Sequence, residues 1–414
     1  MSSNFDIAII GGGAAGLCAA VYAKQIMPDK KIIILEKLDR VGKKLITTGN
    51  GQCNILNKNI DISRYHGKNV DFCRYAFSAI TQQDILDFFE KIGVLITFEP
   101  SGKAYPMSYQ AGSVVDCLRF AAKDSGVALR CSCPVTALKP VLNCYEVTAG
   151  ESVISAQSVI IATGLISGGE RVGSDGSGLK IMEKLGYKTV KTTPSIVQLK
   201  TDNTLTRRLK GIKVDARVCL MNGSKALGED FGEVLFTDYG LSGPPVMQLS
   251  RPVGQGIAPL TVRLDLVPDY SENQLIKMLK ARAASLKSRS CEEFLTGMLN
   301  KRLGQEILKA CGIELSSNVG DIFSQIPAIA AKIKALDFAV TGTTGFANSQ
   351  VTAGGLDTLG FDCETMQSKK HKGLFAVGEL LDIDGDCGGF NLTWCWASAM
   401  LAARSSVKYL KERQ

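Results

Sequence analysis

Residues 6–16 read DIAIIGGGAAG and decide the fold. An apolar strand runs into three spaced glycines, and a helix of small apolar residues follows. Gly11 lets the chain turn out of the strand, and Gly16 lets the helix pack closely on the sheet. Gly13 lacks the side chain that would hold a pyrophosphate away from the backbone. The spacing therefore predicts a strand, turn and helix that bind a dinucleotide.

The residues around this turn complete a nucleotide site. Ala14 and Ala15 open the helix, whose unpaired N–H groups and dipole favour negative phosphates. Residues 32–36 read IIILE, a second buried strand that ends in Glu36. An acidic residue at this distance from the glycines accepts hydrogen bonds from ribose hydroxyls.

The charge-free run 7–23 predicts no membrane insertion, because a span needs about 20 apolar residues and this run is rich in glycine.

Composition and charge define the broad class of protein. The chain has 414 residues, 45% of them hydrophobic, which suits a large core and more than one domain. Its 13 cysteines form no CxxC pair and are accompanied by only 2 histidines, so we expect reduced thiols, no metal and a cytoplasmic location. The net charge of +8 is modest and forms no basic stripe, which argues against a nucleic-acid partner. We expect a small-molecule substrate, and the oligomeric state stays open.

A segment near the end of the chain indicates which dinucleotide is bound. Residues 373–379 read GLFAVGE, a turn, a short buried strand and a Gly-Glu pair, and Asp382 follows. In FAD enzymes of this Rossmann type, a late strand brings Gly378 and Glu379 beside the ribityl chain and pyrophosphate, whereas a nicotinamide domain has no need of it. The paired glycines before residues 390–392 offer backbone donors to the pyrimidine edge of a flavin. The predicted cofactor is therefore non-covalent FAD.

A third segment supports the same cofactor. Residues 158–164 read SVIIATG, a continuous apolar run typical of a strand buried on both faces. Its small end residues, Ala162, Thr163 and Gly164, let the backbone pass close to the adenosine half of the cofactor. An ordinary core strand that ends in a glycine turn has the same pattern. The segment therefore supports FAD only together with the other two.

Four further motifs resemble those of the BaiN/YhiN-type FAD family, within the two-dinucleotide-fold flavoproteins. Residues 42–54 read GKKLITTGNGQCN and are similar to that family's GRKLLxSGNGRCN. Residues 102–106 (GKAYP), 237–244 (TDYGLSGP) and 350–356 (QVTAGGL) are similar to its GRxFP, TxxGLSGP and EVTxGGV segments. The likeness covers almost the whole chain. Lysine or glutamine replaces arginine at positions 43, 52 and 103. The changes at 52 and 103 weaken any transfer of substrate identity, because arginine's fork is lost at both.

The patterns and the resemblance together define an expected site. Tyr105 and Tyr239 are candidates to bind a substrate carbonyl or deliver a proton, because a neutral phenol can donate a hydrogen bond to a developing enolate. Buried packing is the alternative role of each. The residues expected to bind the cofactor are Gly11, Gly13, Ala14, Ala15, Gly16, Glu36, Lys37, Lys43, Lys44, Asn50, Gly51, Val135, Ala162, Thr163, Gly164, Gly378, Glu379, Asp382, Gly389, Phe390 and Asn391.

The predicted fold class is α/β. The flavin segments assign residues 1–194 and 341–414 to a discontinuous Rossmann-like FAD-binding domain. Short alternating segments in residues 195–268 predict an inserted β-rich, barrel-like subdomain. Helical periodicity in residues 269–340 predicts an inserted helical subdomain.

Three functions stay open. The resemblance implies an FAD-dependent oxidoreductase that takes a hydride from NAD(P)H and reduces a carbon–carbon double bond conjugated to a carbonyl, as bile-acid dienone reductases of this family do. The first alternative is an amine oxidase that uses oxygen, because other relatives are described as aminoacetone oxidases. No second GxGxxG motif is present, so NAD(P)H would bind transiently. The second alternative is a non-catalytic binding protein that flavin stabilises.

Overall fold

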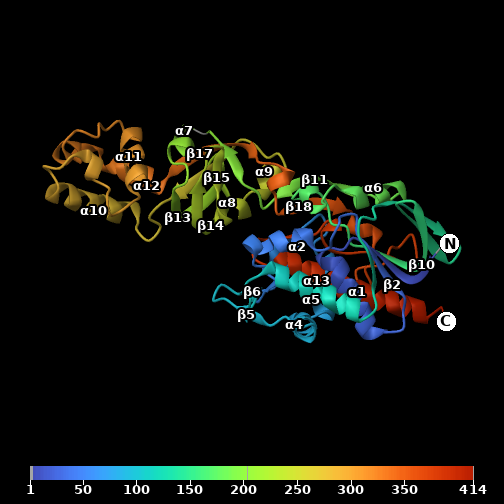
Figure 1. Cartoon of the computed structure of the whole chain (residues 1–414). Coiled ribbons are helices and arrows are strands. Elements are labelled where there is room, and N and C mark those ends of the chain that lie inside the picture. The colour runs from blue at the N-terminus through green and yellow to red at the C-terminus, as the bar shows by residue number, and fades with distance from the viewer. Residues whose placement is uncertain (1–2, 203, 414) are drawn as a thin grey trace. The chain divides into compact units, whose positions relative to one another are not determined.

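The computed structural model describes residues 3–202 and 204–413, and the chain divides into two compact units (Figure 1). The first unit contains Met1–Pro194 and Phe346–Gln414, and the second contains the inserted Ser195–Gly345. Each unit has its own cluster of buried apolar side chains. The architecture is α/β, as the sequence predicts.

A mixed seven-stranded sheet forms the centre of the first unit. Its strands are β1 (Ser3–Ile10), β2 (Ile32–Leu35), β7 (Ala128–Arg130), β8 (Val135–Val141), β9 (Cys144–Ala149), β10 (Ser152–Ile161) and β19 (Leu374–Ala376). The order is β7-β2-β1-β10-β9-β8, with β19 also paired to β10. The pairs among β7, β2, β1, β10 and β19 are parallel. The three segments assigned to the dinucleotide therefore follow the ends of neighbouring parallel strands, where open α/β sheets bind ligands.

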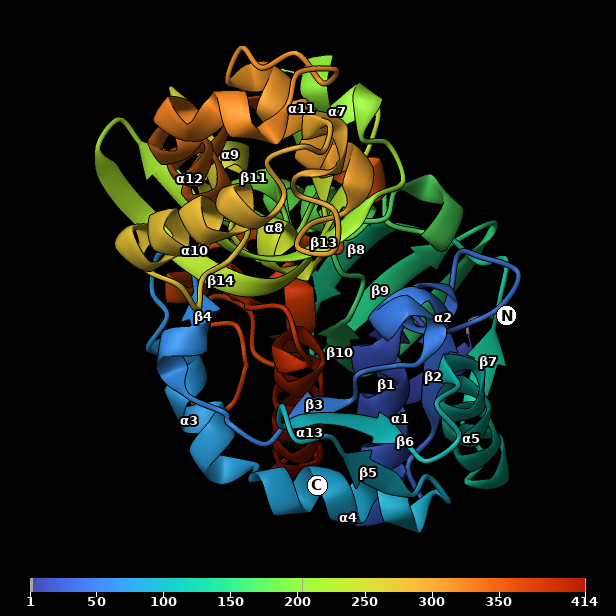
Figure 2. The ribbon, with the colours of Figure 1, turned by 90° about the vertical axis from the view of Figure 1, so that its left-hand side faces the viewer.

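Helices of small and aromatic residues pack within this unit. Helix α1 (Ala14–Ile26) packs against both α13 (Phe390–Lys411) and α5 (Ala111–Asp124), as Figure 2 also shows. Small side chains on α1 allow this close approach. The two tryptophans of α13, Trp394 and Trp396, are fully buried. Helix α13 is thus held in the core, and its first residues have a fixed position.

Shorter elements surround the sheet. Three small sheets pair β3 (Leu56–Asn57) with β6 (Lys103–Pro106) and β5 (Ile96–Phe98), β4 (Tyr65–His66) with β20 (Asp384–Gly385), and β11 (Thr189–Ser195) with β18 (Val351–Leu356). The remaining α-helices of this unit are α2 (Lys43–Thr47), α3 (Phe72–Ala79), α4 (Gln82–Lys91) and α6 (Ser177–Lys184). The 3₁₀ turns are η1 (Thr48–Gly51), η2 (Ile62–Arg64), η3 (Glu170–Val172), η6 (Phe346–Asn348), η7 (Thr358–Gly360) and η8 (Gly378–Leu380).

The inserted unit is a closed barrel with added helices. Its barrel order is β12 (Leu199–Thr201), β15 (Gly240–Ser242), β14 (Lys225–Phe236), β13 (Lys213–Asn222), β16 (Leu260–Asp265) and β17 (Leu336–Thr343). Its helices are α7 (Thr204–Arg208), α8 (Pro244–Gln248), α9 (Arg251–Gly254), α10 (Glu272–Ser285), α11 (Lys301–Ala310) and α12 (Ile326–Lys334), with turns η4 (Cys291–Glu293) and η5 (Val319–Gln325). Both predicted features, a barrel and a helical part, are present.

One boundary differs from the prediction. The sequence patterns place residues 336–340 in the helical part and residues 341–345 in the Rossmann-like domain. Strand β17 instead pairs with β16 and β12 and closes the barrel, so these residues belong to the inserted unit. Local periodicity cannot reveal a strand whose partners lie about 70 to 140 residues earlier.

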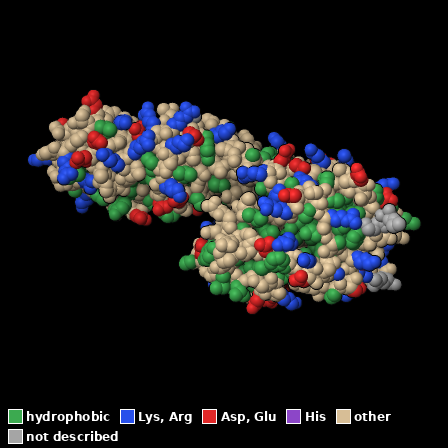
Figure 3. Space-filling model, viewed as in Figure 1, with side chains coloured by type: hydrophobic (Ala, Val, Ile, Leu, Met, Phe, Trp, Pro, Cys, Tyr) green, Lys and Arg blue, Asp and Glu red, His purple; other side chains and the backbone are tan. Residues whose placement is uncertain are grey.

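Two observations concern the charges on the surface and the hydrophobicity of the helices. On the faces of both units visible in Figure 3, Lys and Arg side chains are interspersed with Asp and Glu. Within the described part of the chain, no helix is long and apolar enough to cross a membrane.

Candidate functional site

The fingerprint turn contains one glycine that the chain itself does not require. A Cβ atom at Gly16 would overlap the carbonyl oxygen of Gly11, and one at Gly11 would lie 2.6 Å from that of Ala162. A Cβ atom at Gly13 would meet nothing within 4 Å. The backbone of Gly13, with φ of −81°, also suits other residues. Open space at this position fits the approach of a ligand.

The sequence segments around this turn converge. Ala14 and Ala15 are the first residues of α1, which has no side-chain cap at its start. A Cβ atom at Gly378 would lie 3.3 Å from the Cβ of Ala15, and one at Gly164 would lie 3.7 Å from Oε2 of Glu379. Uncapped N–H groups at a helix start attract phosphate. The early and late flavin segments therefore meet at the helix N-terminus.

A pocket of about 350 Å³ lies beside the turn, at the ends of β1 and β2. Its lining includes five residues expected to bind the cofactor, namely Gly11, Glu36, Lys37, Val135 and Thr163. It also includes Asp175, Ser177 and Lys180, which no sequence motif marks. Lys37 Nζ lies 2.7 Å from Asp175 Oδ1. The mixed apolar and polar lining and the size fit an adenosine group.

Glu36 is held rigidly at the edge of this pocket. Its Oε2 accepts a hydrogen bond from the Gly12 N–H (2.8 Å), and its Oε1 accepts one from the Leu38 N–H (2.8 Å). The side chain is 9% exposed. Glu36 therefore orders the glycine turn, a role that the spacing did not predict, and it also lines the pocket.

We expect Glu36→Ala to weaken FAD binding about 10 to 150-fold, because one charge-assisted hydrogen bond contributes about 1.5 to 3 kcal/mol. The affinity is measured by titrating apo-protein with FAD. Asp362→Ala is the control, since Oδ1 of Asp362 also accepts two backbone N–H bonds, from Glu364 and Thr365, away from the pocket. Equal FAD affinity in the Glu36 variant and wild type would move the adenosine site elsewhere.

Glu379 joins segments that are far apart in the sequence. Its carboxylate accepts hydrogen bonds from Lys44 Nζ, from Ser167 Oγ (2.6 Å) and from the Thr352 N–H (2.8 Å). Lys44 Nζ also donates to Ser167 Oγ. The carboxylate and the ammonium group neutralise each other, so both can be partly buried. The network fixes the segments at the centre of the expected cofactor site.

Two other predicted residues have partners within the chain. Lys43 Nζ lies 2.6 Å from the exposed Asp39, which lies four residues earlier in the loop before α2. The buried Asp382 accepts a hydrogen bond from the Lys68 N–H at 2.8 Å. Their roles toward a cofactor stay predictions, and Lys43 in particular already has an ion-pair partner.

The start of α13 is shaped by its own side chains. Gly389, with φ of 100°, occupies the N-cap position. Asn391 Oδ1 accepts from the Gly385 N–H (2.8 Å), and its Nδ2 donates to the Gly385 carbonyl (2.7 Å). Phe390 is buried, and its carbonyl accepts a hydrogen bond from Tyr65. These side chains hold the turn, which leaves the backbone N–H groups of the helix start for a ligand.

The GNGQCN segment faces this helix start. Asn50 and Gly51 have positive φ values of 59° and 86°, and a Cβ atom at Gly51 would meet nothing within 4 Å. Asn54 is 8% exposed, and its buried Oδ1 has no hydrogen-bond partner among residues 3–202 and 204–413. A Cβ atom at Gly389 would lie 2.8 Å from that oxygen. Burial raises the pKa of Cys53 to about 12, so its thiol is a neutral packing group.

Tyr105 lies on β6 in the same region. Its ring is buried and stacks on Tyr109 with the ring centres 5.5 Å apart. Burial, followed by the charges of Glu99 and Cys387, raises the pKa of its phenol. Among the described residues its hydroxyl has no hydrogen-bond partner. A neutral phenol that is free to donate is what proton delivery requires.

Tyr239 belongs to the inserted unit. It is half-buried in the turn before β15, and its carbonyl accepts a hydrogen bond from the Thr201 N–H at 3.1 Å. Its catalytic role stays a prediction. His66 lies in no flavin motif, and its Nε2 lies 2.8 Å from Oδ1 of the buried Asp386. No sequence pattern links His66 to Asp386, because the two residues are 320 positions apart.

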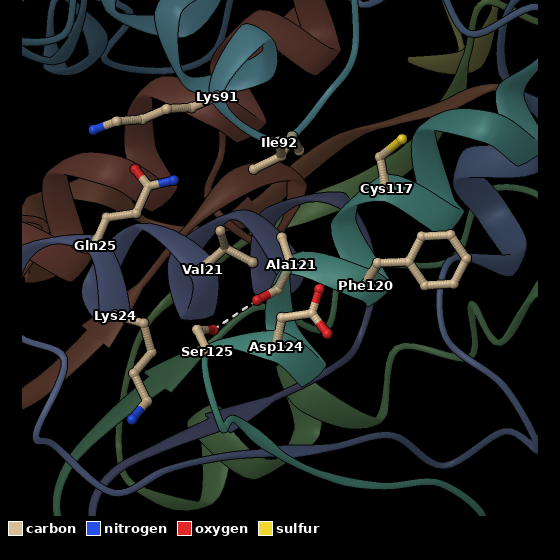
Figure 4. Close-up of a pocket in the computed structure, with 10 residues that line it drawn as sticks. All are labelled: Val21, Lys24, Gln25, Lys91, Ile92, Cys117, Phe120, Ala121, Asp124 and Ser125. Atoms are coloured by element: carbon tan, nitrogen blue, oxygen red, sulfur yellow. Dashed lines mark hydrogen bonds between the residues drawn. The ribbon is translucent and has the colours of Figure 1, made fainter.

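Other possible sites contribute less. A second pocket of about 310 Å³ lies between α1 and α5 (Figure 4). In it Ser125 Oγ donates to the Ala121 carbonyl, and Lys24 Nζ donates to the Pro28 carbonyl. All cysteines are free thiols, and the described residues contain no cluster of three or more potential metal ligands. The chemistry is therefore concentrated around the dinucleotide turn and the start of α13.

The arrangement fits FAD along its length. The pocket at Glu36 suits the adenosine, the open Gly13 and the start of α1 suit the pyrophosphate, and the start of α13 with the unpartnered Asn54 oxygen suits the flavin. A nicotinamide dinucleotide domain would need only the first two. Fold and site thus define a Rossmann-type flavoprotein.

Comparisons with known proteins identify the family. The family described as HI0933-like protein Rossmann domain matches residues 5–405, and the chain belongs to it. A 3-dehydro-bile acid delta(4,6)-reductase from Clostridium scindens is 34% identical over 97% of this chain and 99% of its own. A ribosomal RNA dihydrouridine synthase from Escherichia coli is 28% identical over 98% of each chain. The family resemblance seen in the motifs is confirmed, and the chain is an FAD-dependent oxidoreductase.

Solved structures agree on the fold. A 3-ketosteroid-delta4-(5alpha)-dehydrogenase from Rhodococcus jostii matches with a TM-score of 0.51 and 13% identity, over 98% of this chain and 97% of the other. At this identity the likeness shows the fold alone.

Proposed function

We propose that this chain reduces a carbon–carbon double bond conjugated to a carbonyl, in a steroid-like dienone, with electrons from NAD(P)H. The observation that carries the proposal is the end-to-end likeness, at 34% identity, to the C. scindens protein. Its name denotes reduction of double bonds in an oxidised bile acid. A carbonyl conjugated to such bonds makes the distal carbon electrophilic, which suits hydride addition.

The residues of the first unit support this chemistry. Bound FAD would supply it by accepting a hydride from NAD(P)H and delivering it to the double bond. The start of α1 would hold the phosphates, and Glu36 the ribose. Saturating the bond also requires a proton, and the Tyr105 hydroxyl is free to donate to the carbonyl oxygen or to provide that proton.

The relatives named ribosomal RNA dihydrouridine synthase support a second candidate function. Two of them, from E. coli and Haemophilus influenzae, are 28% identical over 98% of this chain. In uracil the C5=C6 bond is conjugated to the C4 carbonyl. Its reduction is therefore the same class of reaction on another substrate.

The purified protein is expected to carry FAD that acid precipitation releases. Mixed anaerobically with NADH or NADPH, its flavin absorbance should bleach, and a 3-oxo-4,6-diene steroid should restore it as the double bond is saturated. Bleaching by an amine alone would favour the oxidase. Reoxidation by uridine-containing RNA and not by the steroid would favour the second candidate.

Two results would reject the proposal outright. A protein without FAD, whose apo form also gained no thermal stability from added FAD, would not be a flavoprotein. A flavoprotein that no reductant of these kinds bleached would be the non-catalytic binding protein.

A further inference from the structure

A positively charged side chain lies at the start of α13 beside the two glycines. Lys103, on β6, has its Cε 3.6 Å from the position of a Cβ atom at Gly388. Asn57 Nδ2 donates a hydrogen bond to the Gly388 carbonyl at 2.8 Å and fixes this turn. Lys103 therefore reaches the point where the 22-residue helix begins.

The charge of Lys103 is not neutralised within the chain. The other half-buried lysines of the site each have an acidic partner: Lys37 pairs with Asp175, Lys43 with Asp39 and Lys44 with Glu379. Lys103 is also half-buried, but its Nζ forms no ion pair or hydrogen bond with any residue of 3–202 or 204–413. An unpaired ammonium beside this turn favours an anion nearby.

A second, independent observation points to a ligand at the same turn. Asn54 is only 8% exposed, its buried Oδ1 has no donor among the described residues, and this oxygen lies 2.8 Å from the Cβ position of Gly389. An unpaired acceptor, the free N–H groups of a helix start and a cation thus surround one turn. The pyrimidine edge of a flavin complements this set, because it alternates carbonyl acceptors with one ring N–H donor.

We propose that Lys103 is the cation that stabilises the reduced flavin, and that Asn54 accepts a hydrogen bond from the flavin ring N–H. The inference rests on the proposed function in that FAD is bound. A hydride from NAD(P)H brings two electrons and one proton to the neutral ring system, which leaves one negative charge at its pyrimidine edge. The unpaired ammonium and the helix dipole favour that charge.

The test is the midpoint potential of the FAD-loaded protein, measured by slow anaerobic reduction against a reference dye. In Lys103→Met, the ratio of the affinities for reduced and oxidised flavin should fall about tenfold relative to wild type. For a two-electron couple, this lowers the midpoint potential by about 30 mV. Sulfite, whose addition to flavin creates the same negative charge, should bind about tenfold more weakly. Lys103→Arg, which keeps the charge, should restore both values.

The matched control is Lys58→Met. Lys58 is exposed and follows β3 in the same small sheet, and its N–H bonds to the Gly102 carbonyl. It should leave the potential unchanged. If Lys103→Met does not fold, Lys103→Gln retains a polar head and gives the same comparison.

A Lys103→Met protein with wild-type potential and sulfite affinity would overturn the inference, and so would an equal shift in Lys58→Met. A changed KM for substrate with an unchanged potential would also overturn it, because the charge would then act on the substrate. Failure of the wild-type chain to bind FAD is a different result, and it rejects the proposed function itself.

Discussion

Tyr105→Phe is expected to lower turnover about 10² to 10⁴-fold while FAD binding and the flavin spectrum stay nearly unchanged. The substitution removes only a hydroxyl that bonds to no described residue. The buried ring and its stacking on Tyr109 remain. A loss confined to turnover therefore reports proton delivery or carbonyl binding. Turnover is measured as steady-state reduction of the dienone by NAD(P)H.

Tyr145→Phe is the control for this prediction, because its hydroxyl donates to the Lys372 carbonyl and has a structural role. It should affect stability more than turnover. Tyr239→Phe is measured alongside and is expected from its motif to lower turnover in the same range. Wild-type turnover in the Tyr105 variant would reduce Tyr105 to a packing residue and leave Tyr239 as the donor.

The pH dependence gives a second readout for Tyr105. Burial raises the pKa of its phenol above the ordinary value of about 10. A raised pKa keeps the donor protonated to higher pH, so the alkaline loss of turnover should begin only above pH of about 10 and should be absent in Tyr105→Phe. A loss that begins well below this pH would point to another acid.

The sequence predicted the parts of the site that are local in the chain. The turn at residues 11–16 and the strand ending in Glu36 each depend on neighbouring residues, so their spacing carries the information. The contacts of Glu36 with Gly12 and Leu38 follow from the same short segment but require its folded geometry. Patterns of this kind gave the fold class and the family.

The remaining parts depend on contacts between distant segments. Lys43 and Lys44 are adjacent and look equivalent in the sequence, yet one pairs with Asp39, four residues earlier in the loop before α2, and the other with Glu379. Asn54 meets the turn at Gly389 only because α13 is packed in the core. No periodicity records such meetings. The same limit explains why β17 was assigned to the wrong domains.

Gly13→Ala is expected to weaken FAD binding about 10² to 10⁴-fold without unfolding the apo-protein. An added methyl group meets nothing within 4 Å, and the backbone φ of −81° already suits alanine. As an N-cap, alanine costs at most about 1 kcal/mol relative to glycine. If phosphates approach this backbone, the methyl group holds them away, and losing two charge-assisted hydrogen bonds costs about 3 to 6 kcal/mol.

Two further glycines make the interpretation specific. Gly112→Ala, in α5, also meets nothing within 4 Å and should leave FAD affinity unchanged, with a small gain in helix stability. Gly16→Ala should unfold the apo-protein, because its methyl group would overlap the Gly11 carbonyl. Thermal unfolding of each apo-protein, with and without FAD, separates the two kinds of effect. Wild-type FAD affinity in Gly13→Ala would mean that no phosphate lies against this turn, and the pyrophosphate would have to bind elsewhere on the sheet edge.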